Sequence, residues 1–129
     1  MTVDNLKVPQ GATCTLNGTR VKGTVKVERG ATLRATNVRV VGNVQAENHK
    51  QVNVSGSVVG GSVQVKQGGG SSLSGNTVNG DVQYFTNRGA IAIRSNRIDG
   101  NLQCKENQPA PTGGSNVVQG NKEDQCRRL

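Results

Sequence analysis

A motif of alternating apolar residues around one glycine occurs five times in full along the chain and a sixth time in degraded form, at 118–122. It has the form apolar-x-Gly-x-apolar-x-apolar and is seen first in residues 21–27 and 40–46. A repeat at a fixed period of this size is typical of a protein built from stacked structural units. The structure of one unit therefore constrains the whole chain. The glycines of the six copies lie 19, 19, 19, 20 and 20 residues apart, at Gly23, Gly42, Gly61, Gly80, Gly100 and Gly120.

Each repeat contains strands and has no room for a helix. Apolar and polar residues alternate in the motif, which is the period of a β-strand, and a second alternating pair, such as Leu33 and Ala35, precedes it. A unit of two or three short strands cannot bury its inner face alone, so the units must stack and pair their backbones with the next coil. We predict an all-β fold, a single-stranded right-handed parallel β-helix (one polypeptide chain winding on itself) of about six coils. Each coil is 19–20 residues long. Right-handed coiling is expected because the strict hexapeptide period of left-handed forms is absent.

The length and composition fit one such domain. The chain has 129 residues, of which 18 are glycine, and only 2% are aromatic, too few to fill a wide globular core. We predict an N-terminal coil at 1–23, regular coils at 24–107, and a loop with a C-terminal cap at 108–129. The longest apolar run, 90–93, holds only four residues, so no transmembrane segment is predicted.

Polar residues also recur in fixed slots of the repeat. Such ladders are expected to brace the corners of the coils, because an asparagine amide can donate to the coil on one side and accept from the other. The first predicted ladder is Asn43, Ser62, Asp81, Asn101 and Asn121, and the second is Ser57, Asn76, Asn96 and Asn116.

The three cysteines point to one disulfide. Cys104 falls in an inward slot of the last full coil, and Cys126 follows it by one coil plus three residues. A chain that returned across the open end would bring the two together, so we predict a Cys104–Cys126 bridge. Cys14 falls in an inward slot and is expected to be a buried free thiol. A disulfide predicts an oxidising compartment, and hence a secreted or cell-surface protein whose signal peptide is not in this chain.

The charge of the chain favours anionic partners. Sixteen Lys and Arg against eight Asp and Glu give a net charge of +8. Such a surface attracts anionic cell-wall polymers or polysaccharides, although a merely solvated basic face is the alternative. Nucleic acid is not favoured, because only Tyr84 and Phe85 could stack on a base. The predicted ligand-binding residues are Arg20, Lys22, Arg34, Arg39 and Arg97.

Evidence for catalysis is sparse. Glu28 and Glu47 occupy the same outward slot of neighbouring coils, at about the separation of a retaining glycosidase pair. No aromatic sugar platform accompanies them, and the only histidine, His49, lies in a turn without a predicted partner. The three cysteines are also too few for a zinc site. We therefore predict no enzymatic activity, no cofactor and no metal.

A few outward apolar residues suggest self-association. Val41, Val58 and Phe85 fall in outward slots and are predicted oligomer contacts. The uncovered N-terminal end of the coils is a second candidate, because unpaired ends of parallel ladders favour pairing with another chain. We expect a homo-oligomer formed through an end or a face.

The repeated Val-x-Gly-Asn-Val-Gln run resembles small secreted β-helix proteins of bacteria, especially actinobacteria. The segment GATCTL around Cys14 and the ending NLQC at Cys104 share this resemblance, as does QGNKEDQC at Cys126. A more distant likeness is to bactofilins, which are right-handed β-helices that polymerise end to end. The chain departs from bactofilins in its coil length, its paired cysteines and its basic charge.

The resemblance implies an exported protein of the bacterial envelope without assigning an activity. Together with the residues, it favours a non-enzymatic structural or adhesive module that binds anionic glycan through a basic face. The alternatives are a self-assembling bactofilin-like filament or scaffold protein and, third, a polysaccharide-cleaving enzyme.

Overall fold

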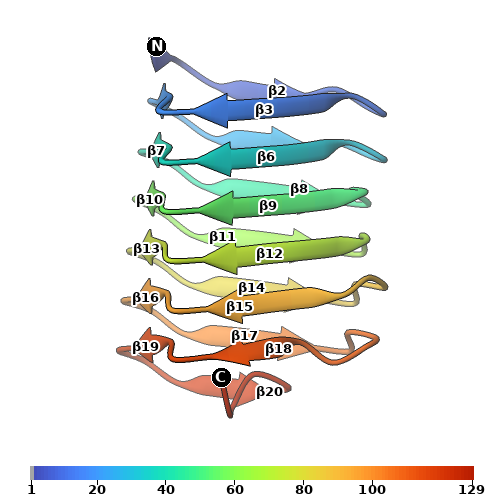
Figure 1. The fold of residues 1–129 in the computed structure, drawn as a ribbon, viewed down its shortest axis with the longest axis vertical. Coiled ribbons are helices and arrows are strands. Elements are labelled where there is room, and N and C mark those ends of the chain that lie inside the picture. Colours follow the sequence, from blue (N-terminus) through green and yellow to red (C-terminus); the bar gives the residue numbers. More distant parts are fainter. Residues whose placement is uncertain (1) are drawn as a thin grey trace.

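The chain winds into a right-handed β-solenoid. The computed structural model describes residues 2–129. The chain descends from the N-terminus, running right to left along the front strands and left to right along the back strands, which is the sense of a right-handed helix (Figure 1). All pairings are parallel, and each coil contributes one strand to each of three sheets. The predicted parallel β-helix of about six coils is confirmed, with three strands in each full coil.

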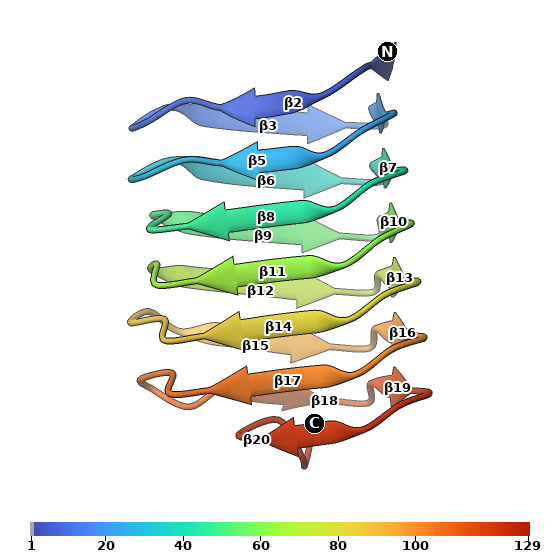
Figure 2. The ribbon, with the colours of Figure 1, turned by 180° about the vertical axis from the view of Figure 1, so that it is seen from behind.

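Sheets A and C meet at one corner, and sheet B lies behind sheet C. Sheet A consists of β1 (Thr2–Val3), β4 (Arg20–Val21), β7 (Arg39–Val40), β10 (Val58–Val59), β13 (Thr77–Val78), β16 (Arg97–Ile98) and β19 (Val117–Val118). Sheet B, in front in Figure 2, consists of β2 (Leu6–Val8), β5 (Val25–Val27), β8 (Val44–Glu47), β11 (Val63–Lys66), β14 (Val82–Phe85), β17 (Leu102–Lys105) and β20 (Lys122–Asp124). Sheet C consists of β3 (Thr13–Asn17), β6 (Thr32–Thr36), β9 (Gln51–Ser55), β12 (Gly70–Ser74), β15 (Ile91–Arg94) and β18 (Thr112–Gly114).

The core is a set of ladders in which like residues stack. Val25, Val44 and Val63 are paired in register in sheet B, and all three are buried. Inward positions of the other sheets are filled in the same way, because the period of two sends alternate side chains to the core. Tyr84 is completely buried, and its hydroxyl lies 2.9 Å from Ser71 Oγ. Burial raises the pKa of Tyr84 to about 12.

The glycine of the repeat is required by close approach between coils. The backbone N–H of Gly42 donates to the carbonyl of Gly23, and that of Gly80 to Gly61, each at 2.9 Å. A Cβ on Gly42 would lie only 2.6 Å from the Gly23 oxygen, closer than real Cβ contacts. The spacing of 19 or 20 residues is thus the spacing at which the chain returns to this contact.

The corner between sheets C and A contains the second predicted ladder, and it is buried. Asn96 Oδ1 accepts from the Asn76 backbone N–H at 2.9 Å and from Asn76 Nδ2 at 3.1 Å. Asn96 Nδ2 in turn donates to Asn116 Oδ1 at 3.0 Å and to the Leu73 carbonyl at 2.8 Å. Each asparagine thus accepts from one neighbouring coil and donates to the other, as expected.

The corner between sheets A and B differs from the prediction. Its side-chain oxygens accept backbone N–H groups from the next coil and do not form an amide chain. Asn43 Oδ1 accepts from the Ser62 N–H at 2.8 Å, and Asp81 Oδ1 accepts from the Asn101 N–H at 2.7 Å. This corner needs an acceptor only, which explains why Ser62 and Asp81 can take the place of asparagine in the ladder.

A buried ladder between sheets B and C was not predicted. Asn87 Nδ2 donates to Asn107 Oδ1 at 2.9 Å, and Asn107 Nδ2 donates to Gln125 Oε1 at 3.0 Å. The spacings in this ladder are 20 and 18 residues, and Gly68 precedes Asn87 in the same slot. The changing residue type and the irregular spacing hid the ladder in the sequence.

The C-terminal end of the solenoid is closed by the returning chain. Cys104 and Cys126 form the predicted disulfide, with their Cα atoms 5.3 Å apart, and both are fully buried. The Leu129 carbonyl accepts from Asn116 Nδ2 at 2.9 Å. Residues 108–129, predicted as a loop and a disulfide-pinned cap, also contain β18, β19 and β20, which extend all three sheets. Backbone pairing suffices for these strands, although Gly113 and Gly114 bring no apolar side chain.

The N-terminal end is less covered. β3 is the terminal strand of sheet C, so nothing pairs with its outer edge within residues 2–129. Cys14 and Leu16 point inward from β3 but are only half-buried. The expectation that Cys14 is buried is therefore wrong, because no further strand of sheet C covers it.

Candidate anion-binding face

The two kinds of basic residue occupy different sheets. Five arginines lie in strands, and all five belong to sheets A and C. Five lysines lie in strands, and all five belong to sheet B. We call the outer surface of sheets A and C the arginine face. Its arginines are Arg20, Arg34, Arg39, Arg94 and Arg97, whereas the lysines of sheet B are Lys7, Lys26, Lys66, Lys105 and Lys122.

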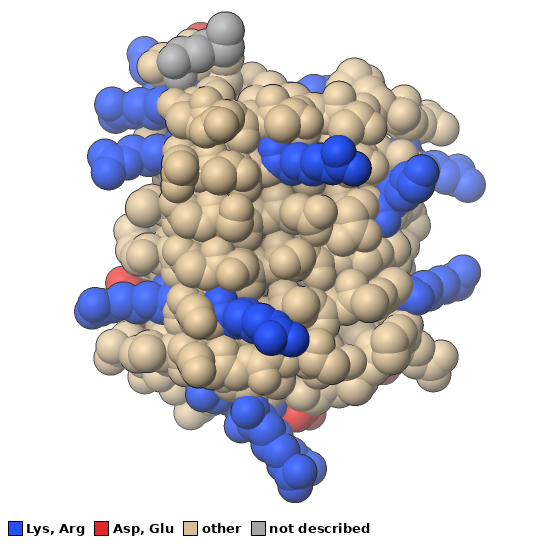
Figure 3. Space-filling model, in the orientation of Figure 1, with Lys and Arg blue, Asp and Glu red and all other residues tan. Residues whose placement is uncertain are grey.

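The acidic residues avoid the arginine face. All eight lie in sheet B or in the corners on either side of it. Figure 3 looks onto sheet C and shows basic side chains crossing an otherwise uncharged surface, with acidic atoms only near its rims. The face therefore has a positive potential that neighbouring carboxylates do not cancel. The acids in strands are Glu47, Glu123 and Asp124, and those in corners are Asp4, Glu28, Asp81, Asp99 and Glu106.

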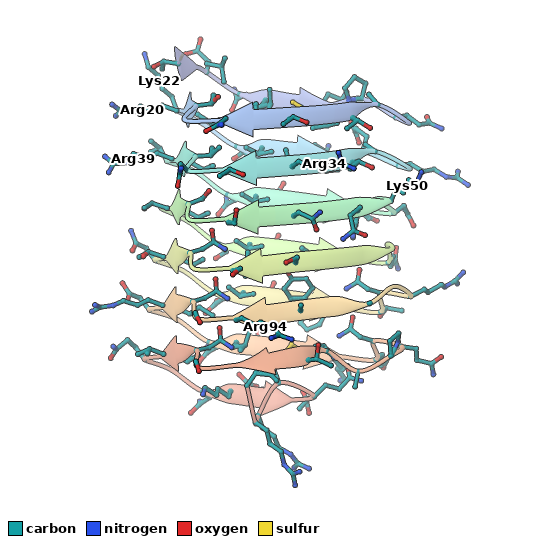
Figure 4. The ribbon with its side chains drawn as sticks, in the orientation of Figure 1. Arg20, Lys22, Arg34, Arg39, Lys50 and Arg94 are labelled. Atoms are coloured by element: carbon teal, nitrogen blue, oxygen red, sulfur yellow. A yellow bond between two sulfur atoms is a disulfide. The ribbon has the colours of Figure 1, made fainter. Side chains whose placement is uncertain are left out.

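The predicted ligand-binding residues do not form one row. Arg20 and Arg39 are direct neighbours in sheet A, and Lys22 lies beside them at the corner with sheet B. These three side chains project from the same edge of the solenoid (Figure 4). Arg34 projects from sheet C, and Arg97 lies three strands from Arg39.

Two further cations border the same surface. Arg94 projects from β15 on the sheet C side, and Lys50 lies at the corner between sheets B and C (Figure 4). The sequence did not single out Lys50. Lys50 lies in a corner outside the regular strand slots, and Arg94 has the outward position after the apolar pair Ile91 and Ile93.

Most arginines of this face have no acidic partner. The ion pairs formed by residues 2–129 are Lys7 with Glu28 at 3.1 Å and Arg97 with Asp99 at 4.0 Å. Arg20 and Arg39 are both exposed and stand directly opposite each other in register. Like charges in that position destabilise a sheet, so a bound anion would relieve the repulsion.

The surface between the arginines is flat and polar. The outward positions of β9 and β12 are Gln51, Asn53, Ser55, Gly70, Ser72 and Ser74. Apart from Gly70, which has no side chain, these are hydroxyl or amide side chains that can hydrogen-bond to a ligand without blocking it. The chain has one tyrosine and one phenylalanine: Tyr84 is buried, and Phe85 belongs to sheet B. The arginine face thus has no aromatic ring on which a sugar or a base could stack.

Sheet B has a different outer surface. A shallow hollow of about 380 Å³ is lined by Glu28 and Glu47 together with Lys26, Arg29 and Lys66. Glu28 is already engaged by Lys7. Beside the hollow, glutamine side chains are hydrogen-bonded along the axis: Gln64 Nε2 donates to Gln83 Oε1 at 3.1 Å, and Gln83 Nε2 to Gln103 Oε1 at 2.8 Å. This surface satisfies its own polar groups to a greater extent than the arginine face does.

His49 is buried in the corner between sheets B and C. Its Nε2 lies 3.2 Å from the Gly70 carbonyl, and its Nδ1 is buried without a hydrogen-bond partner. The imidazole packs against Gly68, where a side chain would collide with it. Burial lowers the pKa of His49 below its usual 6.5.

We expect the protein to lose stability as the pH falls below about 6.5, where an unfolded histidine takes up a proton. The folded state resists this proton because the pKa of His49 is lowered, so acid favours unfolding. Urea unfolding at about pH 7.5 and about pH 5 measures the loss. His49→Ala, which copies Ala31 of the preceding coil, should show a smaller difference between the two pH values. An unchanged difference would contradict this role of His49.

The predicted oligomer contacts do not lie together. Val41 and Val58 are exposed beside sheet A, at 51% and 36% of their full exposure. Phe85 is half-buried and projects from sheet B. The structure therefore does not unite the three in one apolar patch, because successive sheets of a coil face different directions.

Among residues 2–129 no group of three or more His, Cys, Asp and Glu is arranged to hold a metal ion. The same part of the chain contains no helix able to span a membrane. Comparison with protein-family models, with curated proteins and with solved structures found no match for this chain.

Proposed function

We propose that the protein is a non-enzymatic, exported structural and adhesive module of the bacterial envelope, which binds an anionic polymer through the arginine face. The observation that carries the proposal is the separation of charge. Apart from Arg97, which is paired with Asp99, the strand arginines of sheets A and C have no acidic partner, while every acid lies in or beside sheet B. A protein that needed only solubility would gain nothing from this separation.

The disulfide and the rigid scaffold support the same proposal. A Cys104–Cys126 bridge is stable in an oxidising compartment, which favours export. Hydrogen-bonded strands and buried corner ladders hold the backbone of the arginines at fixed positions, so little backbone entropy is lost when a ligand binds. This rigidity suits an adhesive surface.

The two alternative functions, a self-assembling filament and a polysaccharide-cleaving enzyme, have less support. A filament built end to end requires two open ends, but residues 125–129 and the disulfide cover the C-terminal end. A glycan-cleaving enzyme requires a pair of carboxylates free to act on substrate, but Glu28 is paired with Lys7. We therefore favour the adhesive module.

We expect the intact protein to bind purified anionic cell-wall polymer saturably at physiological salt. The Arg20→Ala/Arg39→Ala variant should bind about tenfold more weakly, since two favourable charge contacts of under 1 kcal/mol each are removed. Both side chains are exposed, so the fold should be retained. Titration of fluorescent polymer at increasing salt measures the affinity and its dependence on screening.

The matched control is Lys26→Ala/Lys105→Ala, which removes two positive charges from sheet B. It has the same net charge as the arginine variant, and it should bind nearly as tightly as the unchanged protein. Equal weakening by both variants would show that net charge alone is responsible and would contradict a specific face. Binding that disappears at physiological salt would contradict the adhesive function.

A further inference from the structure

The arginines of the face are arranged at two main levels along the solenoid axis. Arg34 and Arg39 lie in successive strands, β6 and β7, and Arg94 and Arg97 lie in β15 and β16. Between the levels, Arg39 pairs with Val58, Val58 with Thr77, and Thr77 with Arg97 along sheet A. Three steps of about 4.8 Å separate the levels by roughly 14 Å. One ligand must therefore be extended in order to contact both.

The choice of arginine on this face is chemically specific. Lysine supplies positive charge on sheet B, so both residues are compatible with the strands of this fold. The guanidinium group is planar and donates two parallel hydrogen bonds to one phosphate or carboxylate, whereas an ammonium group acts as a point charge. Arginine in every basic strand position of sheets A and C therefore indicates paired hydrogen bonds to an oxyanion.

The surroundings of the arginines distinguish between oxyanions. Carboxylate polysaccharides and nucleic acids bring rings, which proteins usually bind by stacking aromatic side chains. The strands of the arginine face contain no aromatic residue within the described chain. Asn53, Ser55, Ser72 and Ser74 lie between the two levels and offer hydrogen bonds instead. These groups suit the hydroxyl groups and ester oxygens of a flexible chain.

We infer that the arginine face binds a polyol-phosphate polymer, that is, a chain of phosphodiester-linked polyols without stacked rings. The chain lies along the solenoid axis across the strands of sheet C and its corner with sheet A. Its phosphates accept paired hydrogen bonds from the arginines at both levels. This inference rests on the proposed function and specifies the chemistry of its ligand.

Arginine-to-lysine variants provide the test because they keep the charge and remove the paired geometry. Arg34→Lys/Arg94→Lys should bind poly(glycerol phosphate) about tenfold more weakly than the unchanged protein, the effect of losing about 1.4 kcal/mol of oriented hydrogen bonding. The matched control, Lys26→Arg/Lys105→Arg on sheet B, should bind unchanged. Circular dichroism and thermal unfolding of all variants check that the fold is intact.

Two further probes of matched charge separate the ligand classes. Polygalacturonate and single-stranded DNA should each bind the unchanged protein at least about tenfold more weakly than poly(glycerol phosphate). Full affinity of the lysine variant would overturn the inference, as would equal binding of polygalacturonate or DNA, while the proposed function would stand. Failure of all three polymers and of cell-wall polymer to bind at physiological salt would overturn the proposed function itself.

Discussion

Asn96→Leu should destabilise the protein by about 4 kcal/mol, because it leaves two buried donors of Asn76 without acceptors. Asn96 Oδ1 is the acceptor for both the backbone N–H and the side-chain Nδ2 of Asn76. The leucine also cannot donate to the carbonyl of Leu73, as Asn96 Nδ2 does at 2.8 Å. Water cannot replace these bonds, since the corner between sheets C and A is buried. Urea unfolding followed by circular dichroism measures the change.

Asn79→Leu is the control for this prediction. The substitution is chemically the same, but Asn79 is exposed at the corner between sheets A and B, where the equivalent residue of an earlier coil is Val41. We expect a change within about 0.5 kcal/mol for this surface position. If the two variants unfold at the same urea concentration, the buried ladder does not stabilise the solenoid.

The stacking of coils could be predicted from the sequence, because it depends on the type of single residues that recur with one period. An inward valine needs only an apolar neighbour above and below, so Val25, Val44 and Val63 appear as a simple repeat. The glycine of the motif is fixed by a steric contact that every coil shares. A period of this kind determines register, and register determines which residues are neighbours.

The corners could be predicted only in part, because their residues satisfy different hydrogen-bonding needs. The slot of Asn96 requires both a donor and an acceptor, so asparagine recurs there. The slot of Asp81 requires an acceptor alone, and residue type varies. The slot of Asn87 and Asn107 changes spacing from coil to coil, which removes the periodic signal. The backbone geometry at each corner determines the direction and the number of its hydrogen bonds, and residue spacing alone does not give that geometry.

The candidate site, too, could be predicted from the sequence only in part. Arg20 and Arg39 could be placed together from the period alone. The sheets to which Arg34 and Arg97 belong could not be assigned in this way, because a coil of three strands directs its outward slots to three sides. The separation of arginine from lysine becomes visible only when residues are sorted by sheet. Sequence spacing gives neighbours along the axis, whereas the face on which they lie depends on where the chain turns.

Breaking the Cys104–Cys126 bridge should cost about 3 kcal/mol, because it frees a loop with a sequence separation of 22 residues in the unfolded chain. In the folded state, the loss should first loosen β18 and β20, which hydrogen exchange in their backbone amides would detect. Unfolding with and without a phosphine reductant measures the cost. Cys14→Ala retains the bridge and should keep the same sensitivity to reductant. Equal stability of the oxidised and reduced proteins would mean that backbone pairing alone holds the C-terminal coil, and that the returning chain covers that end without the covalent link.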